Sequence, residues 1–120
     1  MKRILIADDR ASSRELVRTV LERAGYEVTE ASDGAEAVAL ALATAPDLVL
    51  LDLHMPVLDG FGAVGQLRAE PRFAATPVVA LTASAMDGDR EHAMTAGFSG
   101  YITKPIRLAA LRAEVRRLIG

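Results

Sequence analysis

The feature that most constrains the fold is a run of four apolar residues, 48–51, that leads directly into an acidic side chain, Asp52. A short unbroken apolar run ahead of helical patterns predicts a strand that is buried on both faces, as in parallel sheets. Met55-Pro56 prevents a helix from beginning at once, so a loop must follow Asp52. Asp59-Gly60 then provides a turn and a helix cap. Asp52 is therefore expected at the carboxyl end of a strand, the edge where open α/β sheets bind their ligands.

The same alternation of a strand pattern with a helical pattern occurs five times along the chain. The other strand patterns lie at residues 4–7, 26–30, 77–81 and 100–103. Short crossover units of this kind predict a parallel sheet with helices on both faces. We expect an α/β, flavodoxin-like (βα)5 doubly wound fold, whose five-stranded parallel sheet has the order 2-1-3-4-5. The whole chain, residues 1–120, is predicted to form one domain.

Local signals predict where the helices begin and which faces they bury. Ser12 and Glu15 have the spacing of a capping box, which predicts the start of the first helix. Asp33-Gly34 is expected to open the second helix, and either Asp87 or Asp89 the fourth. The fourth helix has few apolar residues and is expected to bury little surface. The first helix is predicted to bury one stripe, made of Leu16, Val17, Val20, Leu21 and Ala24.

Composition excludes several classes of protein. The net charge of −2 gives no electrostatic reason to expect a nucleic acid or an anionic membrane as partner. The chain has no cysteine, so it has neither a disulfide framework nor a thiolate metal site. No apolar run has the length of a signal peptide or a membrane span. These observations predict a soluble, cytoplasmic protein.

Reactive side chains follow four of the predicted strands: Asp8-Asp9, Asp52, Thr82 and Lys104. Each of them alone is more simply explained as a helix cap, a turn residue or a surface lysine. Because the carboxyl ends of parallel strands point the same way, however, all of them are expected in one shallow pocket. Three carboxylates so close repel one another, and either Mg²⁺ or a lysine would offset that repulsion.

Such a site favours phosphoryl transfer onto a carboxylate. Asp52 could attack a phosphorus atom and form an acyl phosphate. Mg²⁺ and Lys104 would neutralise two of the phosphoryl oxygens, and the Thr82 hydroxyl could hydrogen-bond the third. No general base or second catalytic centre accompanies them, so the site is expected to receive a phosphoryl group and hold it for a time.

The sequence resembles the response-regulator receiver domains of two-component signalling over essentially its whole length. The resemblance rests on a set of motifs that occur in the order and at the spacing of this family. They are Asp8-Asp9, Asp52 with Met55-Pro56 and Asp59-Gly60, Thr82-Ala83, Tyr101, and Lys104-Pro105. It implies a phosphoacceptor protein that is not an enzyme, since it catalyses only its own phosphorylation and slow autodephosphorylation. The implied partners are a histidine kinase or a histidine phosphotransfer protein and an unknown downstream protein. The chain is expected to be a monomer or weak dimer that binds no nucleic acid and no membrane.

The resemblance also implies a role for each matched residue. Asp52 would be the phosphorylation site, contacted by Thr82 and Lys104 once it is modified. Asp9, Asp52 and the His54 backbone carbonyl would bind Mg²⁺, with Asp8 acting mainly through water. Thr82 and Tyr101 would form the switch, which alters the surface of the fourth helix, fifth strand and fifth helix. The Lys104-Pro105 peptide bond is expected to be cis.

A few residues depart from the family pattern or remain open. Arg10 follows the acidic pair where another acid is frequent, His54 lies two residues after the acceptor, and Ser84 lies two residues after Thr82. By the resemblance these are tuning positions, so the lifetime of the phosphoryl group is left open while the acceptor site is not. Tyr101 could instead be an ordinary half-buried strand tyrosine, and His92 is interpreted as a solvated residue. The exposed arginines of the last helix are either a solvated face or a rim for a partner: Arg107, Arg112, Arg116 and Arg117.

Other classes of protein share this fold. A Mg²⁺-dependent phosphohydrolase of the haloacid-dehalogenase type needs a second Asp two residues after the nucleophile, where this chain has His54. A flavodoxin needs a Gly- and hydroxyl-rich loop in place of Asp8-Asp9, and aromatic residues that would stack on the flavin. A binding module that works without phosphorylation remains if Asp52 cannot be modified. The chain begins just before its first strand and ends with its fifth helix, as expected of a stand-alone receiver or of a domain excised from a larger regulator.

Overall fold

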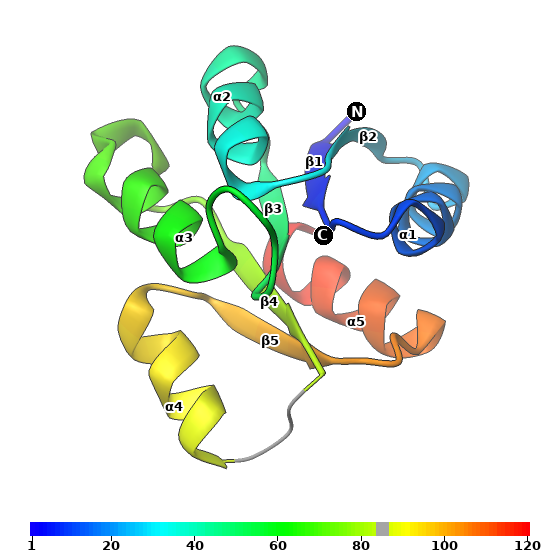
Figure 1. Ribbon diagram of the computed structural model, residues 1–120. Helices are drawn as coiled ribbons and strands as arrows, with labels where there is room; N and C mark the ends of the chain where they lie inside the picture. The colour runs from blue at the N-terminus through cyan, green and yellow to red at the C-terminus, as the bar shows by residue number, and fades with distance from the viewer. Residues whose placement is uncertain (84–86) are drawn as a thin grey trace.

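Five parallel strands form one sheet in the order β2-β1-β3-β4-β5 (Figure 1), which confirms the predicted doubly wound topology. The computed structural model describes residues 1–83 and 87–120. The strands are β1 (Arg3–Ala7), β2 (Glu27–Ala31), β3 (Leu48–Asp52), β4 (Val78–Thr82) and β5 (Gly100–Thr103). The helices are α1 (Ala11–Arg23), α2 (Gly34–Thr44), α3 (Gly60–Ala69), α4 (Asp87–Ala96) and α5 (Leu108–Ile119), with a 3₁₀ turn, η1, at Pro71–Phe73.

The helices cover both faces of the sheet and bury two separate apolar layers (Figure 1). On one face, Val17 of α1 and Leu111 of α5 pack against alternate residues of the central strands, such as Leu50. On the other face, α2, α3 and α4 contribute small or branched side chains such as Ala41 and Val64. Because successive strand residues point to opposite faces, the continuous apolar runs of β1, β3 and β4 supply both layers at once.

The start of α1 differs from the prediction. The helix begins at Ala11, its N-cap residue is Arg10, and no side chain caps it, so the predicted Ser12–Glu15 capping box is wrong. The Asp8 side chain accepts a hydrogen bond from the Arg10 N–H at 2.9 Å. The turn is thus closed before Ser12 and the helix starts earlier. The apolar stripe is also narrower than expected, since Leu16 is 47% exposed and Ala24 is also exposed.

The starts of α2 and α3 agree with the sequence. Asp33 accepts a hydrogen bond from the Glu36 N–H, and Asp59 accepts one from the Gly62 N–H, each at 2.8 Å. The α4 helix begins at Asp87, the first of the two positions expected. The Lys104-Pro105 peptide bond is cis, as predicted. Ser84 lies outside the described residues.

Gly60 fixes how closely α3 approaches the acceptor strand. A Cβ atom on this residue would lie 2.5 Å from the backbone oxygen of Asp52 and 2.8 Å from the Leu53 Cα. The Gly60 N–H also donates to the Leu53 carbonyl at 3.1 Å. The absence of a side chain at this position therefore lets α3 begin directly against the end of β3.

None of the helices in the described part of the chain is long and apolar enough to cross a membrane.

Two alanine substitutions in α3 should have opposite effects on stability. Gly65 is exposed, and a Cβ atom there meets nothing within 4 Å. Gly65→Ala should therefore stabilise the protein by roughly 0.5–1 kcal/mol, because alanine has a higher helix propensity than glycine. Gly60→Ala should instead destabilise it by about 1–3 kcal/mol, because the clash is with backbone atoms. Urea unfolding followed by circular dichroism measures both. A stabilising Gly60→Ala substitution would contradict the packing described here.

Candidate functional site

The sheet order brings the predicted reactive residues to one edge. Asp8 follows β1, Asp52 ends β3, and Thr82 ends β4. Lys104 follows β5 and reaches the other residues across the end of β4. Asp8 is fully buried, Asp52 is 5% exposed and Thr82 is 1% exposed, whereas Asp9 and His54 are exposed. The site therefore combines buried polar side chains at its base with exposed side chains at its rim.

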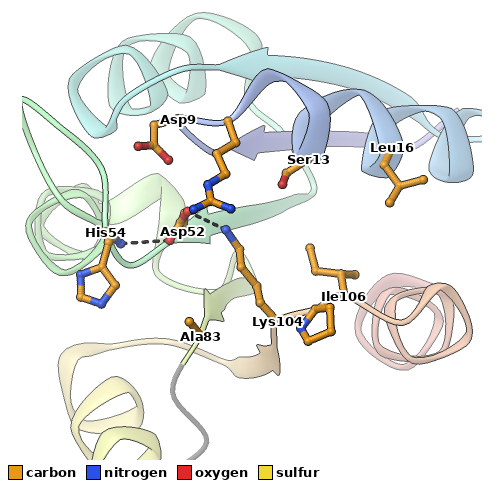
Figure 2. A pocket seen from close by; sticks show the side chains of 10 residues that line it. Asp9, Ser13, Leu16, Asp52, His54, Ala83, Lys104 and Ile106 are labelled. Carbon is orange, nitrogen blue, oxygen red and sulfur yellow. Dashed lines mark hydrogen bonds and ion pairs between the residues drawn. The ribbon is translucent and has the colours of Figure 1, made fainter.

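Both oxygens of the Asp52 carboxylate are engaged. Oδ1 accepts a hydrogen bond from the His54 N–H at 3.0 Å, and Oδ2 accepts one from Lys104 Nζ at 2.8 Å (Figure 2). The same ammonium group donates to Asp8 Oδ2 at 3.0 Å. One cation thus bridges two buried carboxylates and balances part of their charge.

The environment of Lys104 strengthens its hold on its proton. Burial alone would lower its pKa, but the hydrogen bonds and negative charges of Asp52 and Asp8 outweigh burial and raise the pKa above the ordinary lysine value. Lys104 therefore carries its positive charge at neutral pH. The backbone holds it in place as well, because the Lys104 N–H donates to the Thr82 carbonyl at 2.6 Å.

Three carboxylates of the site are close enough to bind one metal ion. Oxygen atoms of Asp8, Asp9 and Asp52 all lie within 4.8 Å of one another. Hard divalent cations such as Mg²⁺ prefer such oxygen ligands and usually retain several waters, which the exposed Asp9 side leaves room for. The donor set therefore fits Mg²⁺.

A pocket of about 620 Å³ opens over the acceptor (Figure 2). Its lining combines polar residues such as Asp9, His54 and Lys104 with apolar residues such as Leu16 and Ile106. The complete lining is Asp9, Arg10, Ser13, Leu16, Asp52, His54, Ala83, Lys104, Pro105 and Ile106. The exposed Leu16, expected in the core, thus belongs to this pocket.

The remaining predicted residues lie near the edge but outside this pocket. Tyr101 is half-buried on β5 and lines a neighbouring hollow with Pro105 and Arg107. His92 is exposed, as expected, yet its ring stacks on Phe61 with centroids 4.4 Å apart. Arg14 has no motif in the sequence that predicts a role for it, although this arginine donates a hydrogen bond to the carbonyl of Asp8.

Comparison with known proteins identifies the family. A model of the response regulator receiver domain matches residues 4–116. The chain belongs to the response regulator receiver domain family. This agrees with the resemblance inferred from the motifs and favours it over the phosphohydrolase and flavodoxin alternatives.

The related proteins differ in length and in role. The receiver chain is 42% identical over 119 residues to RpaA of Synechocystis, a DNA-binding dual master transcriptional regulator, covering 99% of the chain but only 49% of RpaA. Chemotaxis response regulator CheY4 of Vibrio cholerae has a similar structure, with a TM-score of 0.95, 33% identity and 99% coverage of both chains. The receiver domain of the sensor histidine kinase PA1611 from Pseudomonas aeruginosa, solved with a magnesium ion in its active site cleft, gives a TM-score of 0.91, with 37% identity and coverage of 99% and 98%.

Family membership establishes the general function. Receiver domains of two-component response regulators act in phosphorylation-activated signalling and are signalling proteins, not classical enzymes. They partner with histidine kinases or phosphotransfer proteins, and they generally bind Mg²⁺ at an acidic pocket. The cluster of Asp8, Asp9 and Asp52 provides such a pocket in this chain.

Replacing Lys104 should destabilise the metal-free protein at neutral pH. Lys104→Met leaves Asp8 and Asp52 buried without their shared cation, which should cost about 2 kcal/mol once the partial exposure of the lysine is allowed for. Because the lysine pKa is raised on folding, its contribution is complete below the ordinary value of 10.5 and is lost as the pH rises through the raised value. The difference between wild type and variant should therefore shrink above about pH 10.5.

Urea unfolding in EDTA at a series of pH values measures this effect. Lys2→Met is the matched control, since it removes the exposed lysine at the other end of the molecule. Equal stabilities of wild type and Lys104→Met at pH 7 would contradict a stabilising role for the bridge.

Proposed function

We propose that Asp52 accepts a phosphoryl group from a histidine kinase or a histidine phosphotransfer protein. The observation that carries this proposal is the Asp52 carboxylate, which faces the pocket while Lys104 Nζ lies 2.8 Å from one of its oxygens. An Asp52 oxygen would form a bond to phosphorus as the P–N bond of the donor phosphohistidine breaks. The electron pair leaves with the imidazole nitrogen, which takes up a proton from solvent.

The surrounding groups would stabilise charge on the transferred group. Lys104 Nζ, which contacts Asp52, would bind one phosphoryl oxygen. The hydroxyl of Thr82, at the end of the neighbouring strand β4, would hydrogen-bond another. Asp9, Asp52 and the His54 backbone carbonyl would hold Mg²⁺, with Asp8 acting mainly through water. When bound, this ion supplies further positive charge to the phosphoryl oxygens. The side chain of Asp52 is the acceptor in this scheme, and no second nucleophile is required.

Phosphorylation would be transmitted by way of Thr82 and Tyr101 to the surface formed by α4, β5 and α5. Tyr101 pairs with Ala80, two residues before Thr82 on β4, so all three residues project toward the same face of the sheet. Ala80 belongs to the apolar layer under α3 and α4. A shift of Thr82 toward the new phosphoryl group would therefore be felt beneath α4.

The packing of α4 supports its proposed role as the moving element. Among residues 90–96, whose side chains the structure describes, Ala93 alone is fully buried. The C-terminal end is anchored by Arg68, whose Nε donates to the Gly97 carbonyl at 2.9 Å. The same guanidinium donates to the carbonyls of Phe73 and Thr76, each at 2.7 Å. Weak burial of residues 90–96 and a C-terminal end anchored by Arg68 support α4 as the element that moves.

The protein partners follow from this scheme. The upstream partner would be a phosphohistidine donor, and the downstream partner a protein that recognises the altered α4-β5-α5 surface. The exposed arginines Arg107, Arg112, Arg116 and Arg117 would lie on or beside that surface. We infer that residues 1–120 act as one receiver domain, a monomer or weak dimer without nucleic-acid binding of its own.

Incubation with Mg²⁺ and a small acyl phosphate, followed by intact mass measurement, tests the acceptor. Wild type should gain one phosphoryl group, and both Asp52→Asn and wild type in EDTA should gain none, because the nucleophile or the ion is missing. Asp59→Asn is the matched control, since it changes an exposed cap aspartate near the same loop. Addition to Asp52→Asn would show that another residue is the acceptor. No addition to wild type would favour a module that binds without phosphorylation.

A phosphate mimic such as fluoroberyllate should shift amide resonances well beyond the acceptor. In wild type we expect shifts in residues 87–106, which cover α4 and β5, and in Thr82→Ala we expect these distant shifts to be much smaller. Two-dimensional ¹H–¹⁵N spectra provide the measurement, with Asp52→Asn as the control that cannot bind the mimic. Unchanged resonances over residues 87–106 in wild type would rule out the proposed relay.

A further inference from the structure

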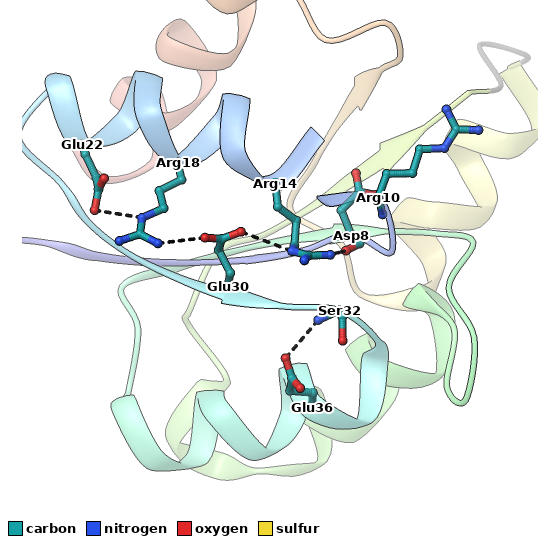
Figure 3. Close-up of polar contacts among 8 residues, drawn as sticks. All are labelled: Asp8, Arg10, Arg14, Arg18, Glu22, Glu30, Ser32 and Glu36. Atoms are coloured by element: carbon teal, nitrogen blue, oxygen red, sulfur yellow. Dashed lines mark hydrogen bonds and ion pairs between the residues drawn. The ribbon is translucent and has the colours of Figure 1, made fainter. Parts of the chain in front are cut away.

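Arg14 connects three elements behind the acidic pair (Figure 3). It lies in the first turns of α1, and its NH1 group donates to the backbone carbonyl of Asp8 at 2.7 Å. Its Nε lies 3.2 Å from Glu30 Oε1 on β2. Only 18% of the Arg14 side chain and 22% of the Glu30 side chain are exposed. The guanidinium is therefore a partly buried link between α1, the end of β1, and β2.

Glu30 is a fixed acceptor for this arginine. Its other oxygen, Oε2, accepts a hydrogen bond from Arg18 NH1 at 2.9 Å (Figure 3), and Arg18 in turn pairs with Glu22 at 3.2 Å. The hydrogen bond to Glu30 is the largest reason that the pKa of Arg18 is raised. The two arginines bond different oxygens of Glu30, so the contact of Arg14 with Oε1 does not use the oxygen that Arg18 binds.

The contact with the Asp8 carbonyl fixes the peptide plane that joins Asp8 to Asp9. The Asp8 N–H donates to the Ala31 carbonyl at 3.2 Å. The Asp8 carboxylate is held by the Arg10 N–H at 2.9 Å and by Lys104 Nζ at 3.0 Å. With Arg14 on its carbonyl, Asp8 has every polar group engaged.

Asp9 lacks such support of its own. Among the residues that the structure describes, none makes a hydrogen bond or an ion pair with the exposed Asp9 carboxylate. The direction of this side chain is thus set by its backbone, and the preceding peptide plane is the one that Arg14 holds. Arg14 could therefore influence where Asp9 points without touching it.

We propose that Arg14 is a positioning residue for the Mg²⁺ site, acting through the Asp8 carbonyl to orient Asp9. The inference rests on the proposed function, in which Asp9 is a direct ligand of the ion. Residues behind a ligand typically change metal affinity by about 10- to 100-fold when they are replaced. Arg14 also carries a positive charge, which by itself opposes binding of a cation.

These two effects predict opposite outcomes, so the sign of the change distinguishes them. If Arg14 acts only through its charge, Arg14→Gln should tighten Mg²⁺ binding, because a nearby repulsion is removed. If it acts by positioning, Arg14→Gln should weaken binding despite the lost repulsion. Arg14→Lys keeps the charge but loses the planar fork that bonds two partners at once, so any loss of affinity in this variant reports geometry.

A titration of the full chain with Mg²⁺, followed by the amide resonances of Asp9 and Leu53, measures the affinity directly. We expect the dissociation constant to rise about 10-fold in Arg14→Gln and several-fold in Arg14→Lys. Arg18→Gln is the matched control: it also removes a partner of Glu30 but leaves the Asp8 carbonyl contact intact, and it should stay within about twofold of wild type. Thermal unfolding in EDTA checks that each variant is folded. If Arg14→Gln does not fold, the Mg²⁺ affinity of Arg14→Lys decides the question.

Several results would overturn the proposal. Unchanged or tighter binding in Arg14→Gln, unchanged binding in Arg14→Lys, or an equal loss in Arg18→Gln would each show that Arg14 does not position the site. Absence of Mg²⁺ binding by wild type would overturn both this inference and the proposed metal site. If wild type binds Mg²⁺ but is not phosphorylated at Asp52, the proposed function fails while the measured role of Arg14 stands.

Discussion

A single ammonium group between two buried carboxylates is the interaction on which the functional edge depends. Asp8 and Asp52 are almost completely removed from solvent, and Lys104 Nζ lies within 3.0 Å of an oxygen of each. Buried charges without a partner are strongly destabilising, so the edge needs a cation at this point. Because β5 is separated from β3 by β4, the residue that supplies the cation must have a long side chain. Lysine meets this requirement.

The parallel topology explains why these groups meet. With the strand order 2-1-3-4-5, β1 and β3 are neighbours at the switch point, and the acids that follow them come close together. Gly60 allows the next helix to begin against the acceptor strand, whose last residue, Asp52, lines the pocket. Packing and chemistry are therefore linked at the same few residues.

The residues around the pocket illustrate what a sequence pattern can and cannot reveal. The residues Asp8, Asp9, Asp52, Thr82 and Lys104 each follow a strand pattern, so their gathering at one edge could be deduced before any coordinates were known. The Ser12–Glu15 spacing gave the wrong cap, because a hydrogen bond from the Arg10 N–H to Asp8 closes the turn earlier. Leu16 fits the apolar stripe of its helix by spacing, yet it is exposed and lines the pocket.

Local periodicity and spacing along the chain were enough to predict the strand and helix order and the candidate reactive residues, and the resemblance of the motifs indicated the sheet topology and the family. Which groups bond to one another across elements depends on three-dimensional packing. Arg14 and Glu30 are 16 positions apart, and nothing in their local sequence distinguishes this pair from other surface charges. Their contact exists because α1 packs beside β2, and the same packing brings Arg14 to the carbonyl of Asp8. Side-chain contacts of this kind depend on distances in space, which a linear pattern does not contain.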